Sequence, residues 1–190
     1  MNDRSGENAR PEPERTIRTE PIFSGKIISV QVDTVELPDG RTATRELVRH
    51  PGAAAVLAVH DGKLIVVEQY RKPLGRMLVE IPAGKLEPGE DPMESARREL
   101  EEETGWRAER LELLHTFYAS PGFADEKVYL YAAHGLSPGN RAPDEDEYLN
   151  VDLITLEQAE AYIREGRIGD AKTIIAVQAW KLLKLAGSPA

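Results

Sequence analysis

The sequence predicts an α+β domain in which helices pack on a mixed β-sheet. Short apolar runs bounded by Gly, Pro and Asp recur along most of the 190 residues, as expected for strands. The runs at 53–60 and 63–68 are almost continuously apolar, which is typical of central strands covered on both faces. One helical segment interrupts the strands and two more follow the last strand, so a sheet with helices on its faces is the expected architecture.

Residues 1–15 are polar, charged and rich in Pro, so we expect a disordered tail. Residues 16–50 predict antiparallel strands, because alternating apolar positions at 27–35 lead into a Pro-Asp-Gly turn and a further strand at 42–48. Residues 51–187 form the main predicted domain. Its first two strands are joined by Asp61-Gly62, a strong signal for a tight hairpin.

A short strand at 78–81 precedes a loop and a well-marked helix. Asp91 suits the N-cap, Pro92 the first helical position and Gly105 the C-terminal stop. The remaining elements follow in a simple order, with a polar loop at 138–146. They are strands at 111–118, 127–134 and 148–154, and helices at 156–166 and 171–185.

The composition restricts the class of protein. The chain carries 24 basic and 33 acidic residues, and a net charge of −9 without a basic stripe argues against a nucleic-acid partner. The apolar runs are far shorter than the roughly 18 residues of a membrane span. There is no cysteine, which excludes a disulfide scaffold, a thiolate zinc site and a cysteine nucleophile. With no apolar signal segment at the N-terminus, we expect a cytoplasmic protein without a membrane partner.

The acidic excess is concentrated in two short segments. Residues 84–105 hold eight acidic residues against three basic ones, and residues 144–147 read Asp-Glu-Asp-Glu. The rest of the chain is balanced, whereas solubilising charge is normally spread over a surface.

On the predicted helix, three glutamates form a row beside a narrow apolar stripe of Met93, Ala96 and Leu100. Like charges at i,i+4 repel, and partial burial strengthens the repulsion unless a cation lies between them. Oxygen ligands completed by water suit Mg²⁺ or Mn²⁺. The alternative is a solvated Glu-rich helix in which Arg98 simply pairs with a glutamate one turn away. The three glutamates are Glu99, Glu102 and Glu103.

The segment from Gly84 to Trp106 resembles the signature of the Nudix hydrolase superfamily position for position. Seven fixed residues at this spacing coincide by chance with odds on the order of 10⁻⁸ per starting point. The resemblance implies the Nudix fold, an α/β/α sandwich with a mixed β-sheet and a strand–loop–helix that holds divalent cations. The fixed residues are Gly84, Glu90, Arg98, Glu99, Glu102, Glu103 and Gly105.

The resemblance also implies roles for these residues. Glu99 and Glu103 are expected to be metal ligands, with Glu102 as a further ligand or close support and the carbonyl of Ala83 contributing. Arg98 is expected to orient the glutamates and Glu90 to brace the loop. The expected cation is Mg²⁺, with Mn²⁺ as an alternative.

Further segments resemble the ADP-ribose pyrophosphatase branch of that superfamily. Pro121, followed by Gly122, lies at the offset from Gly105 that marks this branch, although a Pro-Gly pair after a strand is also an ordinary turn. The remaining matches are Thr44-Arg45-Glu46, Glu68-Gln69-Tyr70-Arg71, Glu80-Ile81-Pro82-Ala83-Gly84, and the segments 120–126 and 144–147. The expected substrate-binding residues are Arg45, Glu46, Arg71, Glu80, Pro121 and Gly122.

In the resembling enzymes, an arginine at the position of Arg71 binds the phosphate or ribose side of the substrate. An arginine at the position of Arg45 reaches from one subunit to the adenine of the substrate bound by the neighbouring subunit. Both also make sense as surface ion-pair partners. A loop glutamate in those enzymes helps to activate the attacking water. Glu145 is the first candidate for it and Glu147 the second, against the alternative of a solvated charge run.

The expected function is Mg²⁺-dependent hydrolysis of ADP-ribose to AMP and ribose 5-phosphate by a homodimer in which residues 16–50 cross to the partner. The first alternative is a Nudix pyrophosphatase for another nucleoside diphosphate derivative, such as a nucleotide sugar or a dinucleoside polyphosphate. The second is a non-catalytic ADP-ribose sensor.

Overall fold

The computed structural model describes residues 12–143 and 147–187. The chain forms two compact units. One holds the chain through His50 together with Gly122–Ala124, and the other holds Pro51–Pro121 and the chain from Asp125 onward. Residues 1–11 of the predicted tail lie outside the described residues.

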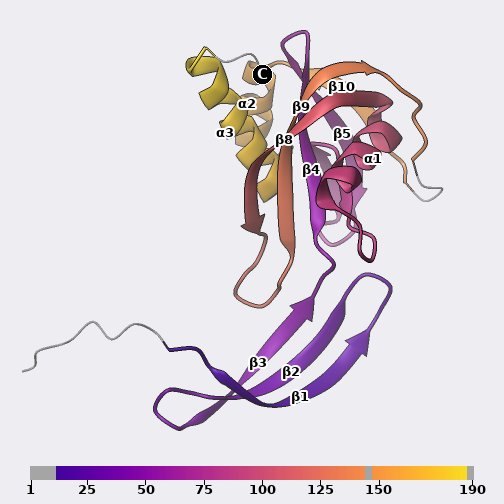
Figure 1. Ribbon diagram of the computed structural model, residues 1–190. Helices are drawn as coiled ribbons and strands as arrows, with labels where there is room; N and C mark the ends of the chain where they lie inside the picture. The colour runs from indigo at the N-terminus through magenta and orange to yellow at the C-terminus, as the bar shows by residue number, and fades with distance from the viewer. Residues whose placement is uncertain (1–11, 144–146, 188–190) are drawn as a thin grey trace, which may run out of the picture. The chain divides into compact units, whose positions relative to one another are not determined.

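The first unit is a three-stranded antiparallel sheet of β1 (Arg15–Ser24), β2 (Ser29–Glu36) and β3 (Thr42–Arg49), shown in Figure 1. The predicted pair corresponds to β2 and β3, whereas β1 was not recognised as a strand of its own. The reason is physical: all ten residues of β1 are exposed, so no burial periodicity marks them. Pro21 also lies beside an irregularity in the β1–β2 register.

The second unit is built on a seven-stranded sheet. Five strands follow the order β10-β5-β4-β9-β8, and β4 pairs with β9 in parallel while the other pairs are antiparallel, so the sheet is mixed as predicted. Asp61 and Gly62 both have positive φ, of 48° and 73°, as a type I′ turn requires. The five strands are β4 (Ala53–His60), β5 (Lys63–Arg71), β8 (Trp106–Tyr118), β9 (Lys127–Pro138) and β10 (Asn150–Ile154).

The two central strands, β4 and β5, separate beyond the turn that joins them. The strands β6 (Arg76–Glu80) and β7 (Ala83–Lys85), which lead to the helix that carries the three glutamates, pair with them there. β4 and β5 pair only at Val59↔Leu64 and His60↔Lys63. Beyond this point β5 pairs with β6 and β4 with β7, while the amide of Val56 donates to the carbonyl of Pro82 at 2.9 Å. The sequence predicts a strand only at 78–81 and not β7, because three residues are too few to show a strand pattern.

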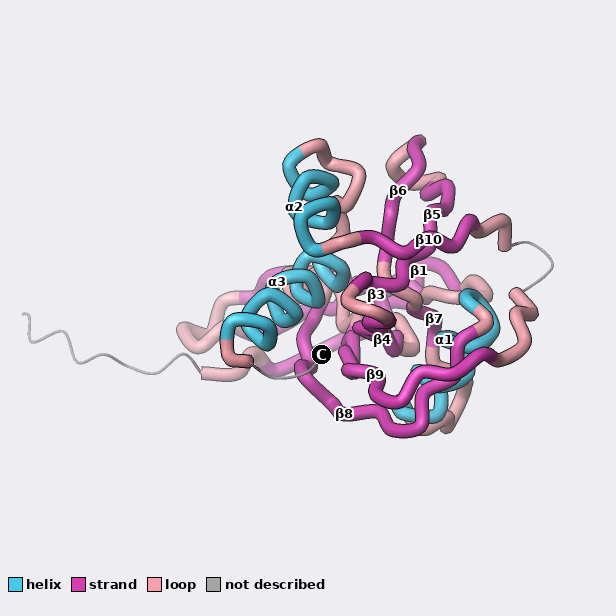
Figure 2. The backbone as a smooth tube through the Cα atoms, turned by 90° about the horizontal axis from the view of Figure 1, so that it is seen from above, coloured by secondary structure: helices cyan, strands magenta, loops and turns pink. Residues whose placement is uncertain are grey.

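Helices cover both faces of this sheet (Figure 2). Ala96 and Leu100 of α1 (Pro92–Thr104) belong to one buried cluster with Ala54, Val56 and Ile65. The other cluster is formed with α2 (Leu156–Arg164) and α3 (Ala171–Leu185). The expected α/β/α arrangement is therefore confirmed. Within the described part of the chain, no helix is both long enough and apolar enough to cross a membrane.

Candidate metal and active site

Helix α1 begins and ends as predicted. The side chain of Asp91 accepts a hydrogen bond from the amide of Met93 at 2.8 Å, and Gly105 closes the helix in the left-handed conformation at φ 75°. Ala96 and Leu100 are fully buried, but Met93 is 38% exposed, so its assignment to the apolar stripe was wrong. The buried face of α1 instead continues into two carboxylates.

Glu99 and Glu103 lie on that buried face, with 8% and 2% of their surface exposed. Glu103 Oε2 accepts a hydrogen bond from the amide of Ala83 at 3.0 Å, which ties β7 to the helix. Burial raises the pKa of Glu103 to about 8, and the negative charges of Glu99 and Glu147 add to this effect. Burial also raises the pKa of Glu99 to about 7, against the opposing charge of Arg98. Both carboxylates are therefore short of positive charge.

Gly84 leaves the space that Glu99 occupies. A Cβ atom built on Gly84 would lie 1.9 Å from the Cδ and Oε1 atoms of Glu99. No side chain can therefore be added at residue 84 without displacing this carboxylate. The structure thus gives a steric reason for the first glycine of the motif.

Arg98 joins the remaining glutamates of the motif. Its Nε donates to Glu90 at 3.0 Å, and its Nη1 donates to Glu99 at 2.7 Å and to Glu102 at 3.0 Å. Glu90 also accepts a hydrogen bond from the amide of Glu87 at 2.9 Å, so it braces the loop before the helix. The Glu102 side chain is 39% exposed and faces more solvent than Glu99 and Glu103 do.

A buried ion network lies at the end of β6. Both oxygens of Glu80, a residue only 1% exposed, accept hydrogen bonds from Arg71, each at 2.6 Å, and Lys172 Nζ is 2.5 Å from Oε2. Burial alone would raise the pKa of Glu80, but Arg71 and Lys172 outweigh it and hold the pKa below its ordinary value. Lys172 also contacts Asp170, the N-cap of α3, at 3.0 Å. Glu80, expected to bind substrate, is thus occupied in holding Arg71 and Lys172.

The charges of Arg71 and Lys172 also act on Glu103, so this network and the carboxylate row belong to one site. Nothing in the sequence identified Lys172, because a single lysine after a helix cap has no distinguishing pattern. Glu147 acts electrostatically on Glu99 and Glu103 and lies at the same site. Glu145 falls within 144–146, outside the described residues.

The other expected substrate-binding residues belong to other segments of the chain. Arg45 and Glu46 belong to β3 in the first unit, where Arg45 pairs with Glu14. Pro121 and Gly122 are exposed on the connection between β8 and β9.

The donor set fits a divalent cation. Glu99 and Glu103 are buried one turn apart on α1, the charge of Glu99 helps to raise the pKa of Glu103, and Gly84 keeps room for Glu99. Within residues 12–143 and 147–187, no three Asp, Glu or His side chains form a ready-made metal-binding group. Arg98 donates to Glu99 and Glu102, and the amide of Ala83 donates to Glu103.

The model of the NUDIX domain matches residues 48–176, which include the whole strand–loop–helix. The chain belongs to the Nudix family. A second model, described as the nucleoside diphosphate sugar hydrolase N-terminal domain, matches residues 14–48 of this Nudix chain.

Curated relatives support the assignment over most of the chain. A protein of Bacillus methanolicus named methanol dehydrogenase activator is 58% identical to this chain. An ADP-ribose pyrophosphatase of Bacillus subtilis is 54% identical to it. Each of these two alignments covers 87% of this chain and 91% of the relative. An ADP-ribose pyrophosphatase of Mycobacterium tuberculosis is 38% identical, covering 86% of this chain and 81% of the relative. A crystal structure described as an ADP compounds hydrolase shares the fold at a TM-score of 0.83 and 22% identity, covering 94% of this chain and 98% of that one.

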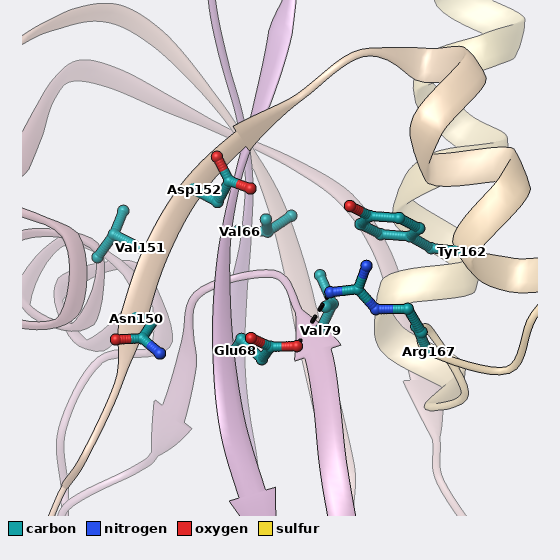
Figure 3. A pocket seen from close by; sticks show the side chains of 8 residues that line it. All are labelled: Val66, Glu68, Val79, Asn150, Val151, Asp152, Tyr162 and Arg167. Atoms are coloured by element: carbon teal, nitrogen blue, oxygen red, sulfur yellow. Dashed lines mark hydrogen bonds and ion pairs between the residues drawn. The ribbon is translucent and has the colours of Figure 1, made fainter.

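A separate pocket of about 200 Å³ opens between β5, β6, β10 and α2 (Figure 3). Its floor includes Val66 and Val79, which belong to the cluster of α2 and α3 rather than that of α1. Arg167 at its rim is 3.0 Å from Glu68 and lies over the ring of Tyr162. This pocket of the Nudix domain is thus on the face of the sheet opposite the carboxylate helix.

Proposed function

We propose that this chain hydrolyses the diphosphate of ADP-ribose to AMP and ribose 5-phosphate in a Mg²⁺-dependent reaction. The observation that carries the proposal is the pair of buried carboxylates, Glu99 and Glu103, beside the Arg71 network. The name ADP-ribose pyrophosphatase on two relatives, at 54% and 38% identity, supports the choice of substrate. The 58% identical relative is named for the activation of another protein. Its name therefore says nothing about the reaction, which is inferred from the residues of the site.

The proposed roles follow from charge. A diphosphate diester is strongly anionic, and Mg²⁺ would neutralise its oxygens and acidify a bound water. Glu99 and Glu103 would hold the metal with the carbonyl of Ala83, and Glu102 would supply a further ligand or a close support. Arg98 and Glu90 would keep the glutamates in place. Mn²⁺ is the expected substitute.

The proposed step is attack by water on one phosphorus, with cleavage of its bond to the bridging oxygen. The proton of the water would pass to a carboxylate of the acidic loop, for which Glu145 and Glu147 are the candidates. Arg71 donates to Glu80 through Nε and Nη2, so Nη1 takes no part in that ion pair. Arg71 would therefore hold the diphosphate through Nη1. Placement and charge stabilisation are the main requirements of phosphoryl transfer.

The test is identification of products from a small substrate panel. Purified protein is incubated with ADP-ribose, GDP-mannose or a diadenosine polyphosphate, with Mg²⁺, with Mn²⁺ and with a chelator. GDP-mannose belongs in the panel because GDP-mannose pyrophosphatases of Yersinia are 34% identical to this chain. We expect AMP and ribose 5-phosphate from ADP-ribose only with a divalent cation. A tenfold preference for another substrate would overturn the choice of ADP-ribose, and tight binding of ADP-ribose without cleavage would favour a sensor.

We also propose that the chain acts as a cytoplasmic homodimer through its N-terminal strands. Ile17, Ile22 and Phe23 of β1 are 51%, 57% and 55% exposed, although they are large apolar side chains. A sheet that exposes such residues is expected to bury them against a second copy. In that dimer, Arg45 and Glu46 would reach the adenine in the partner's site, with Pro121 and Gly122 on the substrate's edge. Light scattering should give twice the chain mass for the native protein, and an Ile22→Glu variant should be monomeric.

A further inference from the structure

The segment after β9 is attached to the last turn of the carboxylate helix. The amide of Gly139 donates to the carbonyl of Gly105 at 2.7 Å, and the amide of Ala142 donates to that of Glu102 at 2.9 Å. The amide of Asn140 adds a bond of 3.0 Å to the side chain of Glu101. Carbonyls at the end of a helix need partners from outside it, and this segment supplies two of them.

Arg141 extends the attachment to the far side of the acidic loop. Its Nε donates to the carbonyl of Glu103 at 2.9 Å, and its Nη2 donates to the carbonyl of Leu149 at 2.6 Å. Leu149 is buried and immediately precedes β10. One guanidinium therefore connects Glu103 at the end of α1, the stem that leaves β9 and the stem that returns to the sheet at β10.

The end of α1 is shaped to accept this arginine. The last turn of the helix contains no basic residue, so Arg141 supplies the positive charge that a helix C-terminus favours. A Cβ atom on Gly105 would lie 3.3 Å from the Cβ of Arg141, so the glycine serves both the left-handed cap and the approach of Arg141. These contacts are independent of the motif glutamates' own side chains.

The returning stem carries Glu147 two residues before Leu149. Glu147 stands close enough to Glu99 and Glu103 for its charge to act on both. We propose that Arg141 is a positioning residue that fixes the two stems of the acidic loop, residues 139–143 and 147–149, to the end of α1 and so sets where Glu147 stands in the active site. This inference rests on the proposed hydrolytic function and adds a residue to it.

The experiment is a double-mutant cycle on the full-length protein. We compare Arg141→Met, Glu147→Gln and the double variant by kcat and KM for ADP-ribose with saturating Mg²⁺. Loss of the guanidinium should lower kcat by roughly 10- to 100-fold through misplacement of Glu147, with KM changed by less than about twofold. If Arg141 acts through Glu147, the double variant should be no slower than the slower single variant.

Arg141→Lys serves if the methionine variant does not fold, because it keeps the charge but cannot bridge both carbonyls. Arg110→Met is the matched control, since Arg110 is an exposed arginine whose ion pair with Glu112 involves neither α1 nor the stems. It should leave kcat unchanged. Amide exchange at Ala142 should accelerate in the Arg141 variants and not in the control.

Three results would overturn the inference: an unchanged kcat in Arg141→Met and Arg141→Lys, a drop in kcat while Glu147→Gln is fully active, or losses that multiply in the double variant. Inactivity of the unmodified protein on ADP-ribose would instead count against the proposed substrate. The cycle is then run on whichever member of the panel is hydrolysed, so that the two failures remain distinguishable.

Discussion

Helices α2 and α3 cover one face of the central sheet with residues such as Ala159, Val177 and Trp180, which are apolar and almost fully buried. Helix α1 covers the other face with Ala96 and Leu100, but its buried surface also includes Glu99 and Glu103. The face covered by α2 and α3 is thus packed mainly with apolar side chains, whereas the buried surface of α1 includes two carboxylates.

The difference shows where function is placed at the expense of stability. Burying a carboxylate is unfavourable unless enough positive charge lies beside it. Burial raises the pKa of Glu103, and it raises that of Glu99 despite the ion pair with Arg98. On the α3 side the charged groups are paired, as with Lys172 between Glu80 and Asp170. A divalent cation held by Glu99 and Glu103, as proposed above, would supply the missing positive charge on the α1 side.

The largest expected effect is on activity at the carboxylate face. Glu103→Gln should lower kcat for ADP-ribose by about 10³-fold or more, because it removes a proposed metal ligand while the amide keeps the side-chain volume. Thermal unfolding should show that the variant folds. Glu94→Gln is the control, since Glu94 lies in the first turn of the same helix with a 65% exposed side chain. Near-full activity of Glu103→Gln would contradict the metal assignment.

The next largest effect is on stability at the opposite face. Trp180→Ala should reduce the free energy of unfolding by about 3–5 kcal/mol, because it leaves a large cavity in the α3 cluster. Urea unfolding measures the loss, and kcat should stay near that of the unmodified protein at temperatures where the variant is folded. Leu100→Ala, at the face of α1, should lose both stability and activity. A Trp180→Ala variant that is folded but inactive would show that the two faces are not separable.

A smaller effect is expected when pH is varied without metal. Glu99 and Glu103 keep their protons to about pH 7 and 8 when folded, whereas an unfolded chain releases them near the ordinary value of 4.5. Their contribution to stability is thus fully present below about pH 4.5 and is lost as pH rises to about 8. Thermal unfolding in a chelator should give a Tm that falls between pH 5 and 8.5.

Two comparisons sharpen that test. The fall of Tm with rising pH should be shallower in Glu103→Gln than in the unmodified protein. Mg²⁺ should raise Tm most at the alkaline end of the range, because it binds the deprotonated carboxylates. A Tm that rises with pH in the chelator would mean that these groups are not desolvated in solution.

The smallest expected effect is on the free energy of unfolding when Met93, at the edge of the buried surface of α1, is replaced. Met93→Ala should change the free energy of unfolding by less than about 0.5 kcal/mol, because the side chain is 38% exposed. Urea unfolding beside Leu100→Ala checks this, and a loss of 2 kcal/mol or more would restore Met93 to the apolar stripe.

Much of the second unit was predictable from local patterns. The β4–β5 turn at Asp61-Gly62 and both ends of α1 follow from backbone preferences that single residues carry. β1 was missed because none of its residues is buried, and β7 because it is short. The start of β8 at Trp106 was also earlier than the predicted Leu111, since mixed charged residues there conceal the strand.

Within the site, the sequence alone determined the carboxylate row, because residues 3 and 4 apart on a helix share a face whatever surrounds it. Spacing also identified Gly84, Glu90 and Arg98 through the resemblance to a known motif. Only the tertiary structure decided which carboxylates are buried and that Glu80 binds Arg71 and Lys172. It also brought Arg141 to the end of α1, 38 residues from Glu103 along the chain. Burial and pairing depend on segments distant in sequence, so no local pattern contains them.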